Sequence, residues 1–113
     1  MRLTHEQARL VQEHIINNAL SIVEAKRHDY SGPDDPFANF RMSEFAGVDA
    51  WRGCMVRLMD KLSRIKQFME QEGELRVKDE SILDTLSDAV NYVCILGGLC
   101  AEEIGGFGLD ESN

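Results

Sequence analysis

The stretch "DESILDTLSDAVNYVCILGGLCA", residues 79–101, decides the fold class, because its apolar residues recur at helical spacing. Asp79 is the expected N-cap of this helix. One face carries the residues that we expect to form the core, namely Ile82, Leu86, Ala89, Val93 and Leu96. The second half, residues 89–101, is apolar around most of its circumference. A helix that is apolar on all sides is normally buried on all sides, so the pattern predicts several covering helices.

Two other segments have helical patterns. Thr4 and Gln7 have the spacing of a capping box, and the residues that follow at helical spacing are Ala8, Val11, Ile15, Ala19 and Ile22. We expect this helix to run to about residue 29, before Gly32 and Pro33. A second helix is expected between Asp49, as N-cap, and Gly73, with an apolar stripe made of Trp51, Met55, Leu58, Leu62, Ile65 and Met69. No segment alternates with a period of two, so the sequence predicts an all-α fold with three long helices.

The length of 113 residues predicts one helical domain, residues 1–104, followed by a flexible, acidic, glycine-rich tail, residues 105–113. Two other helices from so short a chain cannot surround residues 89–101. We therefore expect a homo-oligomer, built as a helical bundle around this third helix.

Composition narrows the class of protein. The net charge of −8 argues against sequence-independent DNA binding, which needs a basic face. The cysteines Cys54, Cys94 and Cys100 form no CxxC pair and are expected to be reduced and buried. The first ten residues carry charges where a signal peptide would be apolar, and the run 89–101 is too short to span a bilayer. We expect a cytoplasmic protein with no membrane partner.

A polar stripe runs along the third helix, where Glu80, Asp84, Asp88 and Asn91 stand at i, i+4, i+8 and i+11. Asp88 and Asn91 enter the apolar half of the helix, where an unpaired carboxylate is destabilising. Either a divalent cation or basic side chains from the second helix could neutralise the stripe. Glu80, Asp84 and Asp88 are therefore candidate Mg²⁺ ligands.

The second helix carries a basic stripe of Arg57, Lys61 and Arg64, at i, i+4 and i+7. Such a stripe can be a solvated face or a set of interhelical ion pairs. Guanidinium and ammonium groups also bind phosphate oxygens. A basic stripe beside carboxylates fits a Mg²⁺-chelated nucleotide, and Asn91 is a further candidate for ligand contact.

The connection over residues 30–48 carries aromatic residues that an ordinary surface loop does not need, Tyr30, Phe37 and Phe40. Aromatic and arginine planes provide surfaces on which a base can stack. Tyr30, Asn39 and Arg41 are therefore candidates for the nucleoside end of a ligand. The alternative is that the aromatic side chains attach the loop to the helices, and Phe40 is the residue that fits this role best.

The order and spacing of "DY", "NF", "R..DK..R" and "ESI.DTL.D..NY" resemble a family of small phage proteins known as nucleotide modification associated domain type 1. The resemblance covers about residues 20–96. It implies a role in phage nucleotide metabolism or modification. More distantly, the chain is similar to the all-α nucleoside triphosphate pyrophosphohydrolases of the MazG type. Those proteins are helical oligomers that bind Mg²⁺ through an ExxE motif on one helix and an ExxD motif on the next.

The chain departs from the MazG pattern in both motifs. The carboxylates of the third helix are spaced by four residues, and the second helix has "RLMDKLSR" where ExxE is expected. Three functions follow as alternatives: a nucleotide-binding protein that is a Mg²⁺-dependent pyrophosphohydrolase, a non-catalytic sponge that sequesters a nucleotide signal used in defence, or a structural or regulatory helical oligomer.

Overall fold

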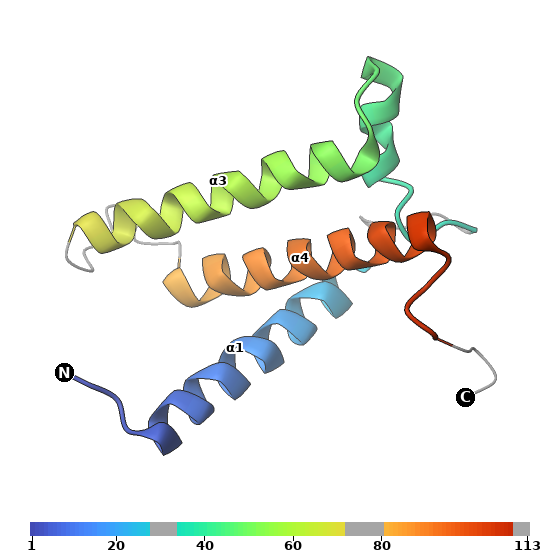
Figure 1. Ribbon diagram of the computed structural model, residues 1–113. Coiled ribbons are helices and arrows are strands. Elements are labelled where there is room, and N and C mark those ends of the chain that lie inside the picture. The colour runs from blue at the N-terminus through green and yellow to red at the C-terminus, as the bar shows by residue number, and fades with distance from the viewer. Residues whose placement is uncertain (28–33, 72–80, 110–113) are drawn as a thin grey trace.

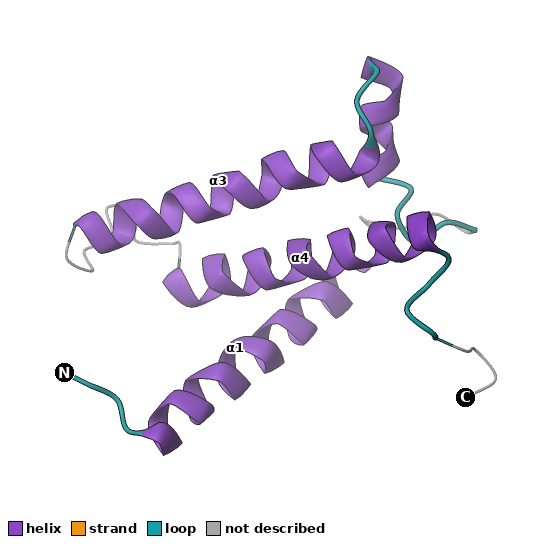
Figure 2. Cartoon of the chain, in the orientation of Figure 1, coloured by secondary structure: helices purple, strands orange, loops and turns teal. Residues whose placement is uncertain are grey.

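The computed structural model describes residues 1–27, 34–71 and 81–109. These residues form three α-helices, α1 (His5–Ala25), α3 (Ala50–Glu70) and α4 (Ile82–Ile104), and the 3₁₀ helix η1 (Phe40–Ala46). No strand occurs among the described residues (Figure 2). The prediction of an all-α fold is confirmed.

The start of α1 follows the predicted capping box. The backbone N–H of Gln7 donates to Thr4 Oγ1 at 3.1 Å, and the backbone N–H of Thr4 donates to Gln7 Oε1 at 3.0 Å. These two bonds satisfy donors that the first turn of a helix otherwise leaves without partners. The helix ends at Ala25, and the Gly32–Pro33 pair that was expected to stop it lies outside the described residues.

The start of α4 differs from the prediction. The N-cap is Ser81, whose hydroxyl accepts hydrogen bonds from the backbone N–H groups of Leu83 and Asp84 at 3.1 and 3.4 Å. Asp79 was therefore the wrong choice of cap, because a serine hydroxyl two residues later satisfies the first-turn donors. The predicted N-cap of α3, Asp49, is confirmed by position, although its carboxylate accepts from Arg52 Nε instead of the backbone.

Helix α4 lies between α1 and α3 and packs against both of them (Figure 1). The core cluster is small and lies where η1 and the start of α3 meet the second half of α4. Its members are Phe40, Ala50, Cys54, Ile95 and Leu99. The connection 30–48 thus includes a helix, η1, which adds an aromatic side chain to the core.

The predicted core face of α4 is wrong for the single chain. The buried residues of this helix are Thr85, Ser87, Asn91, Ile95 and Leu99, whereas Val93, from the predicted face, is 55% exposed. The reason is geometric: α1 and α3 both pack on the other sides of α4. The chain's own helices cover the apolar stripe identified from the sequence only in part: Val93 is exposed, whereas Leu96 is half-buried and packs against the core cluster.

Helix α4 is also the one described helix that is long and apolar enough to cross a membrane by length and composition. The expectation that the apolar run is too short applied to residues 89–101 and not to this 23-residue helix. The finding is weak evidence for a span, because the core helix of a soluble protein meets the same criteria.

The contact between Phe37 and Gly98 predicts opposite effects for two neighbouring substitutions. A Cβ atom on Gly98 would lie 2.3 Å from Phe37 Cζ, so Gly98→Ala should displace the ring and lower the free energy of unfolding by about 1–3 kcal/mol. A Cβ atom on Gly97 meets nothing within 4 Å, so Gly97→Ala should raise stability by up to about 1 kcal/mol through helix propensity. Denaturant unfolding of both variants checks this, and equal effects would contradict the contact.

Candidate functional site

The candidate site is centred on Asp88 of α4. Its Oδ2 atom lies 3.1 Å from Lys61 Nζ of α3, and its Oδ1 atom lies 3.9 Å from Lys26 Nζ, just after α1. The side chains of Asp88 and Lys61 are each 17% exposed, and that of Lys26 is 45% exposed. One carboxylate therefore joins cations from two other segments, and the cluster carries one more positive than negative charge.

The basic stripe of α3 continues on both sides of Lys61. Arg57 is exposed, and its guanidinium carbon lies 4.9 Å from the centroid of the Phe40 ring. This cation–π contact fixes the guanidinium one helical turn from Lys61. Arg64 is also exposed and begins the next turn. The structure thus brings Lys61 to the α4 carboxylate, while its two predicted companions lie along the same side of α3.

A second polar contact joins α1 to the first half of α4. Asn18 Nδ2 donates to Asp84 Oδ1 and to Ser87 Oγ, both at 2.9 Å. Ser87 is fully buried, so this amide satisfies a hydroxyl inside the helix packing. Asp84 therefore accepts from the uncharged amide of Asn18, whereas Asp88 meets the basic stripe of α3.

Sequence reasoning missed Asn18 and Lys26 as members of this polar region. A signal existed for Lys26, which follows the buried Ala19 by seven residues and so lies on the same side of α1. Helical spacing also distinguishes Asn18 from the exposed Asn17 beside it, because Asn18 lies three residues after Ile15 and four before Ile22, on the apolar face of α1.

Asn91 lies in the packing between α1 and α4. Its Nδ2 atom donates to the carbonyl oxygen of Ala19 at 2.9 Å, and the residue is only 8% exposed. The amide bonds a backbone acceptor of the opposite helix and is not directed at solvent. Asn91 was a candidate for ligand contact, and we assign it to helix packing.

The described residues do not fit a Mg²⁺ site in this arrangement. They contain no group of three or more His, Cys, Asp or Glu residues that could hold a metal ion. Asp88 is bonded to lysine, Asp84 accepts from an amide, and Glu80 lies outside the described residues. Mg²⁺ prefers several oxygen ligands in an octahedral arrangement, which these two engaged carboxylates do not offer.

The nucleoside end of the predicted site is only partly described. Tyr30 lies outside the described residues, and Asn39 is exposed immediately before Phe40. Arg41 is held by Asp35 and by both carboxylate oxygens of Glu102, at 2.8 Å each. These contacts raise the pKa of Arg41 above its ordinary value, and the Arg41 guanidinium is the main cause that lowers the pKa of Asp35.

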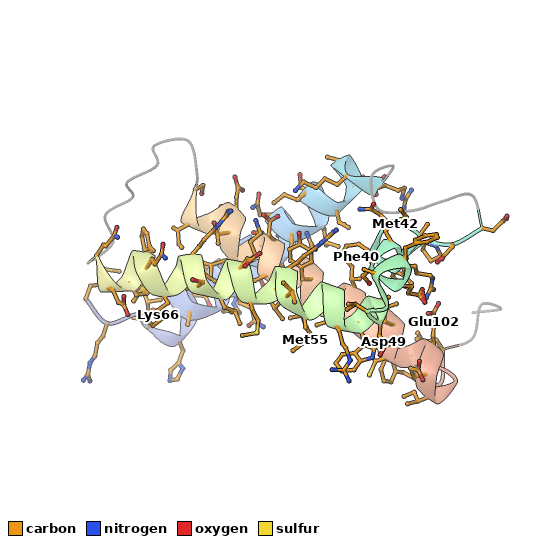
Figure 3. The ribbon with its side chains drawn as sticks, turned by 90° about the horizontal axis from the view of Figure 1, so that it is seen from above. Phe40, Met42, Asp49, Met55, Lys66 and Glu102 are labelled. Atoms are coloured by element: carbon orange, nitrogen blue, oxygen red, sulfur yellow. The ribbon has the colours of Figure 1, made fainter. Side chains whose placement is uncertain are left out.

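The aromatic side chains of the connection have structural roles where they are described. Phe40 is buried, and Phe37 packs against the same core cluster and lies 5.9 Å from the guanidinium carbon of Arg41. Figure 3 shows Phe40 and Glu102 at the same end of the molecule, where η1 approaches the end of α4. The contacts of Phe37, Phe40 and Arg41 therefore fit the alternative prediction, in which these side chains attach the loop to the helices.

No family model, curated protein or solved structure matches this chain.

Proposed function

We propose that the chain binds a nucleotide through its phosphate groups, at the cationic cluster between α1, α3 and α4. The observation that supports this is the convergence of Lys26 and Lys61 on Asp88. Asp88 can offset only one of the two ammonium charges. The half-exposed Lys26 and the exposed Arg57 remain able to donate to phosphate oxygens while Asp88 holds Lys61 in place.

The protein as a whole is acidic, so this local excess of positive charge contrasts with its net charge of −8. A phosphorylated small molecule suits such a site better than a long nucleic acid, which would meet the acidic remainder of the surface. Asn39 and Tyr30 stay candidates for the nucleoside. We place this activity in the cytoplasm, where thiols stay reduced. Cys54, Cys94 and Cys100 form no disulfide in the structure, but only Cys54 is buried, so the expectation that all three are buried is wrong.

Binding without hydrolysis is the function that this arrangement supports best, because the two described candidate ligands for Mg²⁺ have other partners. A protein that retains a nucleotide unchanged would sequester it, as a sponge does. The test is to incubate the protein with a panel of linear and cyclic nucleotides, in Mg²⁺ and in EDTA. Retained ligand and reaction products are then both identified by mass spectrometry. Retention without Mg²⁺ and without products supports the proposal, whereas Mg²⁺-dependent pyrophosphate release would show a pyrophosphohydrolase.

Removal of one ammonium group should weaken this binding strongly. We expect Lys61→Gln to raise the Kd of the best ligand about 10-fold to 100-fold, because Asp88 would then take Lys26 as its partner. The phosphate would lose one hydrogen bond from a charged group, which contributes about 1.5–3 kcal/mol. The matched control is Lys66→Gln, on the same helix. Lys66 pairs with Glu70 and is 73% exposed, so its loss should leave the Kd unchanged.

Thermal unfolding of both variants separates binding from stability. If Lys61→Gln lowers the melting temperature but leaves the Kd of every ligand unchanged, the Lys61–Asp88 pair serves only the fold. The structural or regulatory alternative would then replace the proposal.

A further inference from the structure

The side of α4 that its own chain covers only in part carries a regular apolar stripe. Its members are Ile82, Leu86, Ala89, Val93, Leu96 and Cys100, separated by 4, 3, 4, 3 and 4 residues. Val93 and Cys100 are exposed, and the others are half-buried. This is the spacing of a heptad repeat, which packs against another helix by inserting side chains between those of the partner.

Helix α3 presents a second stripe with the same spacing, made of Trp51, Met55, Leu58, Leu62, Ile65 and Met69. Trp51, Met55, Leu62 and Met69 are exposed, although the helix packs against α4 elsewhere. Met55 and Asp49 lie on one side of the α3 ribbon in Figure 3, and Phe40 and Met42 lie on the other. Two apolar seams therefore belong to helices that are neighbours in the fold.

The two stripes meet in one surface. A cleft of about 660 Å³ between them is lined by Trp51 and Met55 of α3 and by Leu96 and Cys100 of α4. Its rim is charged and mainly acidic, with Arg41, Glu44, Asp49, Glu102 and Glu103. At the other end of α4, Ile82 and Leu86 line an apolar groove of about 350 Å³ together with Leu10, Val11 and Ile15 of α1. We call the surface made by the α3 and α4 stripes the seam face.

The seam face borders the cationic cluster on α3 and lies away from it on α4. Asp88 precedes Val93 by five residues, which places their side chains about 140° apart around α4. On α3, Lys61 lies about 120° from Met55 but only about 60° from Leu58 and about 40° from Ile65. A partner on the seam face therefore approaches Lys61 at its edge and leaves Asp88 on another side of α4.

The exposure of the seam face also indicates a missing layer. Its exposed large side chains are Trp51, Met55, Leu62, Met69 and Val93, which are between 39% and 69% exposed. Large apolar side chains that gather on one exposed face mark an interaction surface. A stable interface takes roughly 800 Å² from each partner, and two helical stripes of this length suit that size.

We propose that the seam face is the interface of a symmetric homodimer, in which α3 and α4 of one copy pack on α3 and α4 of a second copy. The second copy is the fitting occupant because the seam face is self-complementary: each copy brings two heptad seams of equal length and spacing. The dimer then has a four-helix core, and it supplies the second layer that a single layer of helices needs to bury its apolar side.

The first test measures mass by sedimentation equilibrium between about 1 and 100 µM chain. The full chain should have the mass of two copies. Val93→Glu should raise the Kd of the dimer about 100-fold or more, because the two copies would each bury an unpaired carboxylate. The matched control is Val56→Glu, because Val56 is exposed on α3 but lies about 100° from Met55, away from the seam face. It should remain dimeric.

The native cysteines provide a second readout that needs no variant. Cys100 lies on the seam face, so an alkylating reagent should modify it slowly at high protein concentration and faster on dilution. Cys94 is exposed and about 100° from Val93, so its rate should not depend on concentration. Cys54 is buried, and burial raises the pKa of its thiol, so it should react slowly throughout.

A full chain that is monomeric at 100 µM would overturn the proposal, as would a dimer that Val56→Glu disrupts and Val93→Glu does not. A concentration-independent rate at Cys100 would overturn it if Val93→Glu does not fold. A monomer that binds neutral phosphatidylcholine vesicles through the seam face would assign this surface to a membrane instead.

Discussion

Phe40→Ala is expected to lower the free energy of unfolding by about 3–5 kcal/mol. Phe40 is 3% exposed and is the largest side chain of the core cluster. Its ring meets that of Tyr92 edge to face, with centroids 6.2 Å apart, and the guanidinium of Arg57 lies over it. The substitution removes these contacts and leaves a cavity between η1, α3 and α4. Urea unfolding at one fixed protein concentration measures the loss.

The control for this variant is Phe45→Ala. Phe45 belongs to the same 3₁₀ helix but is 88% exposed, so its loss should change stability by no more than about 0.5 kcal/mol. A large loss for both variants would mean that η1 as a whole is sensitive to substitution. A small loss for Phe40→Ala would show that Phe40 does not anchor the connection to the helices.

Asn91→Asp is expected to lower the free energy of unfolding by up to about 4 kcal/mol at pH 7. The substitution puts a carboxylate oxygen where an N–H now donates to the carbonyl of Ala19, inside the packing of α1 and α4. The limit is the free energy needed to protonate the new carboxyl at pH 7, because the protonated form can fit the site. With an ordinary pKa of about 3.9, this is about 1.36 kcal/mol for each of roughly three pH units. A protonated carboxyl can donate to Ala19 and restore the bond.

The pH dependence of this variant has a definite sign. Burial beside a carbonyl raises the pKa of the new carboxyl in the folded state above its unfolded value. The penalty is therefore largest at neutral pH and disappears as the pH falls through the folded pKa toward about 4. The control is Asn17→Asp, because Asn17 is exposed on α1. Thermal melting from pH 4 to pH 8 should show the two variants converging at the acid end, and parallel curves would contradict the buried bond.

The two stripes of the seam face show which part of the core could be predicted from the sequence. Both were identified from the spacing of apolar residues alone. Such periodicity predicts that a face of a helix is buried, but it does not identify the helix that covers this face. In the single chain, α4 is rotated about its axis so that Asn91 and Ile95 are buried instead, and Asn91 donates to the carbonyl of Ala19.

The candidate site also has features that the sequence predicted and features that only the tertiary structure decided. The presence of carboxylates on one helix and cations on the next was readable from spacing, and so was the capping box at Thr4. Which atoms meet was not: Asp88 joins Lys61 and Lys26, while Asp84 joins Asn18. Helical spacing fixes which side chains of one helix share a face, because the backbone geometry is local. The rotation and offset between helices depend on packing across the whole chain, so only the tertiary structure decided the partners of these residues.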